Sequence, residues 1–404
     1  MAKFTEIGLS GLERYSGWVY DEFVKELHAD KGIKIYNQMA NNDPVIGATL
    51  FAIRMLIRQV NWNVEGEEPY KAFLESCMAD MEDTWTEMIT EITSFLEFGW
   101  SWHEKVFKKR ADGRIGWKKI SGRAQSSWDR WQFSETGDIL AMVQRAAPDF
   151  KERVIPKSKS LLFRTTIAKN NPEGKSVLRT AYRPWYFKKH IEQIQGIGIE
   201  RDLAGLPVAF APPEILDPNA SDTLKAIANE LKKIIINIRR DEQEGVLFPS
   251  AFDENGNKLY DLKLLSTGGT RQFNTKEIME YYDQRIAMTI LADFILLGHG
   301  RAGSFALSTS KTKIFTYAIS SFVDMIAAVF NKQAVPEIFN LNGIFLDKYP
   351  KIVASEIEDI NLQELGVFIK NLSLAGAQMF PDDALENDLR RKAHLPAKHT
   401  GVME

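Results

Sequence analysis

Cysteine is nearly absent from this sequence: among 404 residues there is one, Cys77. A disulfide framework or a thiolate zinc site needs several cysteines, so the chain can build neither by itself. Cys77 lies at helical spacing from Phe73 and Met81, which indicates a small side chain buried in a core rather than a nucleophile. We expect a structural thiol in a protein that is assembled in a reducing compartment.

An excess of basic charge is also missing. Lysine and arginine number 51 against 54 acidic residues, a formal net charge of -3. A protein that holds nucleic acid by neutralising phosphates is usually more basic, whereas one that lets DNA slide past needs no such excess. The hydrophobic fraction of 44% is ordinary for a folded protein, and the length predicts two or more compact units.

Long apolar segments are few. The first residues, MAKFTEIGLSGLERYSG, lack the apolar core of a leader peptide. The run from Ala287 to Leu297 is too short to span a bilayer and contains Asp293. We therefore expect a soluble protein without a membrane partner.

Familiar catalytic motifs are missing as well. There is no G-x-S-x-G, no Walker lysine motif and no pair of carboxylates at a recognisable spacing. His103 lies on a predicted strand and lacks the second histidine of a zincin helix, so it reads as a packing or surface residue. No cofactor or metal is expected. The lack of familiar motifs argues only weakly against an enzyme, because catalytic groups can come together from distant positions.

One glycine motif needs a separate interpretation. Residues 298–303 read Gly298-His299-Gly300-Arg301-Ala302-Gly303, which matches G-x-G-x-x-G literally. The dinucleotide motif works only between a strand and a helix, whereas here a predicted helix precedes the glycines. A loop between two helices is favoured, and a nucleotide-binding enzyme that uses this loop stays as an alternative.

The predicted elements indicate an α+β chain. The first 170 residues contain helices, one from Pro44 and others at Pro69 to Met78 and Thr84 to Phe98, and then a small antiparallel sheet with a hairpin turn at Asp112-Gly113. Further strands are predicted at Trp131 to Phe133, Ile139 to Gln144, Ser160 to Phe163, LPVAFAPP, GVLFP and KLYDLKLLS. Further helices are predicted at Lys175 to Asp202, Asp222 to Arg240, Thr275 to Leu297, from about Ser308 to Phe330, Asn361 to Leu374 and Asp382 to Ala393.

The helix from Asp222 carries two features that leave alternatives open. Leu224, Ile227, Leu231 and Ile235 share one face, which can form part of a subunit interface or pack within the chain. Basic clusters occur at Lys232-Lys233 and Arg239-Arg240, and also at Lys188-Lys189-His190. Each is either a solvated helix face or a contact with DNA phosphates or an acidic protein.

The segment NPEGKSVLRTAYRPWYFKKHIEQIQGIGIERDLAGLPV, residues 171–208, resembles the Mu-like branch of tailed-phage portal proteins. That family has an asparagine-proline-x-glycine turn, a tryptophan-rich helix start and a stretch close to IERDLAGLPV. Weaker similarities support it at NNDPVIGATLFAIRMLIRQVNWNV, FLEFGWSWHEKVF, GGTRQFNTKEIMEYYDQRIAMTILADFILLG, GSFALSTSKTKIF and LENDLRRKAHLP.

The resemblance implies the regions of a portal subunit. Residues 1–174 would be a wing, 175–202 and 272–297 two stem helices, 203–271 an α/β clip, 298–308 a tunnel loop, 309–351 a kinked helix with a following strand, and 352–404 a helical crown. The DNA-facing residues would be Gly298, His299, Gly300, Arg301, Gly303 and Ser304. Whether Arg301 touches DNA or a neighbouring subunit stays open.

The resemblance also implies a function: a non-enzymatic ring, usually of twelve subunits, at one vertex of the capsid. Such a ring is a passive channel for DNA packaging and ejection. Its partners would be further copies of itself, the large terminase, neck or adaptor proteins, and the major capsid and scaffolding proteins. It would be assembled in the host cytoplasm and reside in the virion. Another ring-forming neck connector or adaptor is the nearest alternative, although such proteins are usually much smaller.

Overall fold

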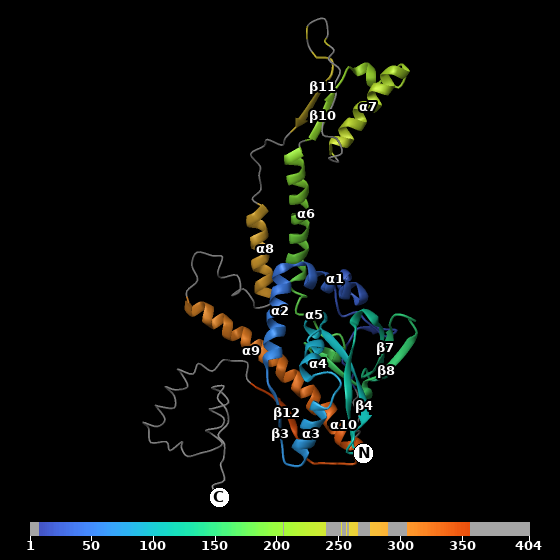
Figure 1. Ribbon diagram of the computed structural model, residues 1–404. Helices are drawn as coiled ribbons and strands as arrows, with labels where there is room; N and C mark the ends of the chain where they lie inside the picture. Colours follow the sequence, from blue (N-terminus) through green and yellow to red (C-terminus); the bar gives the residue numbers. More distant parts are fainter. Residues whose placement is uncertain are drawn as a thin grey trace. The chain divides into compact units, whose positions relative to one another are not determined.

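The computed structural model describes residues 8–204, 206–239, 252, 256, 258–265, 275–289 and 305–355. The chain divides into two compact units. Unit 1 comprises Met1–Lys34, Leu50–Ser176 and Ala302–Glu404, and unit 2 comprises Ile35–Thr49 and Val177–Arg301. Both combine helices with small antiparallel sheets (Figure 1). The α+β class predicted from the sequence is confirmed.

Strand β4 (Trp100–Lys109) is the centre of the main sheet in unit 1. It pairs antiparallel with β5 (Ile115–Arg123) on one side and β9 (Ser160–Arg164) on the other. The predicted hairpin turn joins β4 to β5, and Gly113 takes the left-handed φ of +80° there. A second sheet has the order β6 (Trp128–Phe133), β7 (Ile139–Arg145) and β8 (Glu152–Pro156), of which β8 was not predicted.

Tryptophan dominates the core of unit 1. Trp100 and Trp102 on β4 pack against Trp128 and Trp131 on β6, and none of the four is more than 7% exposed. The rings of Trp100 and Trp131 meet edge to face, with centroids 4.9 Å apart. Aromatic pairs prefer this geometry, and each ring buries a large apolar area. The alternating large residues of β4 therefore mark the positions that face this core.

The helices before β4 differ from the prediction in two places: the first of them was not predicted, and the helix expected from Thr84 is divided. α1 (Ala29–Asn42), α2 (Pro44–Gln59) and α3 (Tyr70–Ala79) precede α4 (Trp85–Ile92) and α5 (Phe95–Phe98). Thr84 starts α4 with a reciprocal capping box to Glu87, as its side chain chemistry favours. The single helix expected from Thr84 to Phe98 was wrong, because the amides of Ser94 and Leu96 bond carbonyls three rather than four residues back and so divide it. Gly99, which directly follows the predicted helix end at Phe98, ends α5 in the left-handed conformation.

Cys77 on α3 is completely buried. Burial raises the pKa of its thiol to about 11, although the nearby Arg110 guanidinium acts in the opposite direction. The thiolate, which is the reactive form, is therefore scarce at neutral pH. The prediction of a structural thiol is confirmed.

The helix α9 (Phe305–Val329) runs through a π-helical turn, η7 (Phe330–Ala334), into α10 (Val335–Leu341). By length and composition alone, Ile314–Leu341 is apolar enough to cross a membrane, with a mean hydropathy of 1.5. It is longer than the run from Ala287 to Leu297 identified in the sequence. Along α9 and into η7, buried residues recur every three or four positions, which is typical of the buried face of a helix in a globular unit. Each is at most 3% exposed: Phe315, Ile319, Val323, Ile326 and Phe330.

Unit 1 also contains short elements. β3 (Trp62–Glu65) pairs antiparallel with β12 (Lys351–Ala354), and β1 (Arg14–Tyr15) with β2 (Trp18–Val19). β12 thus includes the first three residues of the expected crown, 352–354. The crown helices predicted near 361–374 and 382–393 lie outside the described residues.

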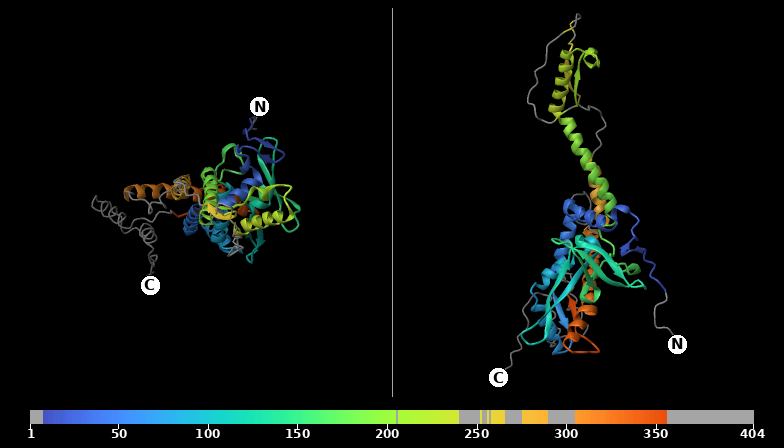
Figure 2. Two further views of the ribbon diagram at one scale, coloured as in Figure 1. Left: turned by 90° about the horizontal axis from the view of Figure 1, so that it is seen from above. Right: turned by 90° about the vertical axis from the view of Figure 1, so that its right-hand side faces the viewer.

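Unit 2 contains α6 (Tyr182–Ala204), β10 (Leu206–Phe210), α7 (Asp222–Arg239), β11 (Asp261–Leu265) and α8 (Thr275–Thr289). β10 and β11 form a two-stranded antiparallel ribbon, and α7 lies along it (Figure 2). The GVLFP segment at 245–249, predicted as a strand, lies outside the described residues, as does the predicted end of α8 at 290–297.

The first helix of unit 2 begins later than predicted. The pattern favoured a start at Lys175, whereas α6 begins at Tyr182. Thr165 is the reason: its side chain accepts a hydrogen bond from the Lys175 amide and donates one to the Lys175 carbonyl. The Ser176 hydroxyl bonds the Glu97 carbonyl in turn. Pro184 does not interrupt α6, because it falls in the first turn, where its missing N–H has no intrahelical acceptor.

Candidate functional site

Helices α6 and α8 form the framework of unit 2, where they lie side by side and antiparallel (Figure 1). Phe187 on α6 stacks on Tyr282 on α8, with ring centroids 6.3 Å apart and planes inclined by 20°. The pair nevertheless leaves apolar side chains uncovered in the single chain. Those exposed by 42 to 65% are Tyr186, Phe187, Ile194 and Ile197 on α6 and Tyr281 and Met288 on α8. Such a surface suits contact with another molecule.

Lys188 holds the helix pair together through buried charges. Its side chain is 5% exposed, and its Nζ lies 2.6 Å from Asp283 Oδ1 on α8 and 2.9 Å from Asp43 Oδ2. Burial alone would lower the pKa of Lys188, but the bonds to Asp283 and Asp43 outweigh it and raise that pKa. The ammonium therefore stays charged inside unit 2.

Asp43 makes a second set of bonds. Its Oδ1 accepts from the backbone N–H groups of Val45, at 3.0 Å, and Ile46, at 3.1 Å, at the start of α2. One carboxylate thus caps a helix with one oxygen and binds Lys188 with the other. In the basic cluster Lys188-Lys189-His190, Lys188 pairs with acidic residues of the same chain. A solvated helix face is therefore the wrong interpretation for that residue.

The Asn171-Pro172-Glu173-Gly174 turn is the last structured feature of unit 1 before the chain enters unit 2. Asn171 Oδ1 accepts a hydrogen bond from the Glu173 amide at 2.9 Å, which closes the turn. Gly174 has a φ of +57°, and a Cβ at this position would overlap the carbonyl oxygen of Gly99. A Cβ on Gly99 would in turn lie 2.5 Å from the Glu173 carbonyl oxygen. The turn and the end of α5 therefore meet backbone to backbone, which only glycine permits.

Glu173 places a carboxyl group against the tryptophan core. Trp131 Nε1 donates a hydrogen bond to Glu173 Oε1 at 3.1 Å. Burial raises the pKa of Glu173 to about 7, and the Trp131 bond offsets this only in part. The folded chain therefore binds a proton at a pH where the unfolded chain has released it.

We expect the stability of unit 1 to fall as pH rises from about 4.5 to about 7, because the folded state holds the Glu173 proton across this window and the unfolded state does not. Glu173→Gln should remove this dependence and stabilise unit 1 by up to about 3 kcal/mol at pH 8, because each pKa unit between the folded and unfolded states corresponds to about 1.4 kcal/mol. Urea unfolding of both proteins at pH 5 and pH 8 measures the difference. Glu135→Gln, at an exposed site, is the control, and a Glu173→Gln curve parallel to the wild type would contradict the prediction.

The predicted interface residues of α7 are divided between an inner and an outer face. Leu231 is 8% exposed, and Leu224 and Ile227 are half-buried, in a helix that contacts β10 of the same chain. The inner face thus packs within unit 2. Lys232 and Lys233 are exposed, and Lys233 forms an ion pair with Glu230 at 3.3 Å. Arg239 is the last residue of α7, and Arg240 lies outside the described residues.

The predicted tunnel loop also lies largely outside the described residues, as do all its DNA-facing candidates: Gly298, His299, Gly300, Arg301, Gly303 and Ser304. Helix α9 begins at Phe305, so residues 305–308 are helical rather than part of the loop. Ser308 and Thr309 resemble N-cap residues, and this chemistry placed the predicted boundary too late.

His103 has the environment of a packing residue. It is 1% exposed and meets Phe163 edge to face. Burial lowers the pKa of its imidazole to about 3, and the Arg123 charge adds to the effect. A histidine that stays neutral throughout the neutral range serves neither as a proton shuttle nor as a pH switch there. Its neighbour Glu104 is engaged in an ion pair with Arg123.

Solved structures with a similar fold come from virion-type particles. A chain of "Neck of empty GTA particle computed with C6 symmetry" is 10% identical, with 96% of this chain and 97% of that chain covered and a TM-score of 0.56. A chain of "Neck of native GTA particle computed with C12 symmetry" is 10% identical over 90% and 94%, with a TM-score of 0.53. A chain of "Virion of native gene transfer agent (GTA) particle" is 9% identical, with 91% of this chain and 94% of that chain covered and a TM-score of 0.53. The fold of this chain is thus similar to that of chains in such particles.

The sequence itself identifies the family. The family described as "Portal protein of Mu bacteriophage" matches residues 33–391, which is most of the chain. This chain belongs to the Mu-type portal protein family, a class of structural proteins, as the Asn171 to Val208 segment predicted. A search of curated proteins found no match.

Proposed function

We propose that this protein forms a closed ring of twelve copies at one vertex of a phage capsid. The observation that carries the proposal is the exposed apolar surface of the α6–α8 pair, at residues such as Ile194 and Met288. A closed ring needs head-to-tail interfaces, and long helices with uncovered apolar faces suit that packing. Membership of the portal family supports the same assembly.

In this proposal the ring is a passive channel for double-stranded DNA during packaging and ejection. A net charge of -3 suits a channel that must not retain DNA, because each neutralised phosphate would add friction. The 298–304 segment would face the DNA, with Arg301 either at the phosphates or at a neighbouring subunit. No nucleotide chemistry is assigned to the chain, so the work of packaging would belong to a large terminase.

The partners would dock at different regions. Terminase, and later neck or adaptor proteins, would meet the clip at 203–271, where α7 exposes Lys232 and Lys233. Major capsid and scaffolding proteins would surround the ring during assembly in the host cytoplasm. The mature location would be the virion.

Native mass spectrometry and negative-stain imaging of the purified chain test the ring. We expect rings whose mass is a multiple of the 46.0 kDa subunit. Ile194→Glu should raise the concentration needed for assembly about tenfold or more, because it puts a charge into an apolar contact. Gln193→Glu, one residue away and also exposed, is the matched control. A chain that stays monomeric at every concentration and salt level tested would overturn the proposal.

A further inference from the structure

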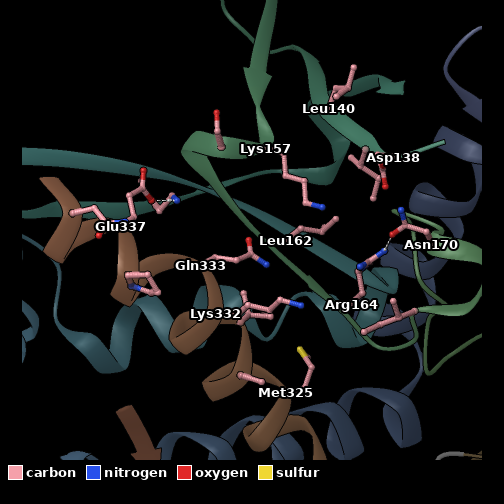
Figure 3. Close-up of a pocket in the computed structure, with 18 of the residues that line it drawn as sticks. Asp138, Leu140, Lys157, Leu162, Arg164, Asn170, Met325, Lys332, Gln333 and Glu337 are labelled. Atoms are coloured by element: carbon pink, nitrogen blue, oxygen red, sulfur yellow. Dashed lines mark hydrogen bonds and ion pairs between the residues drawn. The ribbon is translucent and has the colours of Figure 1, made fainter. Parts of the chain in front are cut away.

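Unit 1 contains a cleft of about 1240 Å³ that no part of the portal function above uses. One wall comes from β7, β9 and the turn between β8 and β9, and the other from α9, η7 and α10 (Figure 3). The segments that line it span the sequence from Lys105 to Leu341. Only the folded unit brings them together.

Three cations point into this cleft: Lys157, Arg164 and Lys332 (Figure 3). Among the described residues none of the three has an ion-pair partner, and Arg164 donates only to neutral oxygens, of Asn171 at 2.9 Å and Asn170 at 3.3 Å. Burial lowers the pKa of Lys157, and the charges of Arg164 and Lys332 lower it further, although Asp138 acts in the opposite direction. The cations thus repel one another, and a bound anion would relieve that repulsion.

The carboxylates in the cleft do not balance this charge. Glu337 is engaged by Lys105 in a buried ion pair. Asp138, on the exposed side, is the other carboxylate that lines the cleft. Three uncommitted cations therefore face one uncommitted carboxylate. The excess positive charge favours an acidic partner from outside the cleft.

The rest of the lining indicates which kind of acidic partner fits. Leu140, Ile167 and Leu341 are 51%, 63% and 43% exposed at the rim. None of the described residues that line the cleft is aromatic, so they offer no platform on which nucleic-acid bases could stack. Cations with an aliphatic rim instead suit carboxylates carried on a protein chain.

Unit 1 also carries a matching group of opposite charge. Glu65 ends β3, and Glu67 and Glu68 follow in the turn before α3; all three are exposed. In the described part of the chain none of them forms an ion pair; Glu68 accepts only a hydrogen bond from the Ala72 amide. Three carboxylates without ion-pair partners at the end of β3 and in the turn after it thus match, in number and in sign, the three cations of the cleft. A head-to-tail contact between copies uses two different, complementary surfaces of this kind.

We propose that the Glu65–Glu68 turn of one subunit binds the cleft of Lys157, Arg164 and Lys332 in the next subunit. This inference rests on the proposed ring and adds the contact that sets its direction. Complementary charges steer association and reject wrong registers more than they add affinity. The apolar surface of α6 and α8 would supply adhesion, and this contact would orient neighbouring subunits.

Charge reversal in the cleft is the first test. Lys157→Glu combined with Lys332→Glu should raise the concentration for half-assembly at least about tenfold in low salt, because like charges then face each other. Lys159→Glu is the matched control: it is exposed, two residues from Lys157, and does not line the cleft. Far-ultraviolet circular dichroism verifies folding, and Lys332→Glu alone, at an exposed position, replaces the pair if the pair misfolds.

Charge exchange is the decisive test. Glu65→Lys with Glu67→Lys should weaken assembly as the cleft variant does, and all four changes in one chain should restore it to within about threefold of the wild type. The contact is refuted if the wild type forms rings and the cleft variant assembles equally well, or if the exchange restores nothing. In either case the proposed ring stands. A wild-type chain that never assembles refutes both proposals.

Discussion

Replacing Lys188 by methionine should destabilise unit 2 by about 3 to 5 kcal/mol. The change removes the cation that binds both Asp43, which is 3% exposed, and Asp283, which is 30% exposed and lies 2.6 Å from the ammonium. Two carboxylates that are costly to bury then remain without a counter-charge. Because Asp43 also caps α2, its relaxation toward water would weaken that helix start as well.

Amide hydrogen exchange measures this loss locally, since a chain of two units need not unfold in a single step. Protection of α6 and α8 should fall by about two orders of magnitude or more, which is the equivalent of about 3 kcal/mol. Lys189→Met is the control, because Lys189 lies over the Trp185 ring at 5.3 Å and forms no buried ion pair. Adding Asp283→Asn to Lys188→Met should recover part of the protection. If the exchange rates of α6 amides were unchanged, the buried charges would not be what holds α6 and α8 together.

The second large effect is expected at the turn that first indicated the family. Gly174→Ala should destabilise unit 1 by about 3 kcal/mol or more. The left-handed φ of +57° contributes about 1 to 2 kcal/mol, and the overlap with the Gly99 carbonyl adds the cost of moving backbone. Urea unfolding followed by tryptophan fluorescence measures the change, because the Trp100–Trp131 cluster lies in the same unit.

Gly113→Ala separates the two contributions at Gly174. Gly113 has a φ of +80°, and a Cβ there would meet nothing within 4 Å. This control should lose only about 1 to 2 kcal/mol. Equal losses in the two variants would mean that backbone conformation alone explains the glycine at 174 and that the contact with Gly99 is unimportant.

Local chemistry allowed several elements to be predicted from the sequence. The β4–β5 hairpin follows from Asp112-Gly113, and the end of α5 from Gly99, because these signals act within a few residues. Where distant groups compete, the prediction failed. Helix α6 begins at Tyr182 rather than Lys175, because Thr165 holds the backbone of Lys175 in the turn.

The candidate sites show the same division. The portal family could be predicted from the residues of 171–208, since the pattern itself carries that information. The burial of Lys188 could not be predicted from the sequence. Its partners Asp43 and Asp283 are 145 and 95 positions away, and helix spacing does not indicate contacts at such separations. The same holds for the cleft, whose cations Lys157, Arg164 and Lys332 belong to three different elements.

By itself the sequence determined the α+β class, the portal family, the structural role of Cys77 and the glycines that the turns require. These depend on composition, on periodicity and on the conformations that each residue tolerates, which are properties of short segments. Tertiary structure alone decided which charges are buried in pairs, which apolar helix faces stay uncovered and which cations share a cleft. Those outcomes depend on distances between residues far apart in the chain, and such distances exist only once the core around Trp100 and Trp131 and the α6–α8 pair have formed.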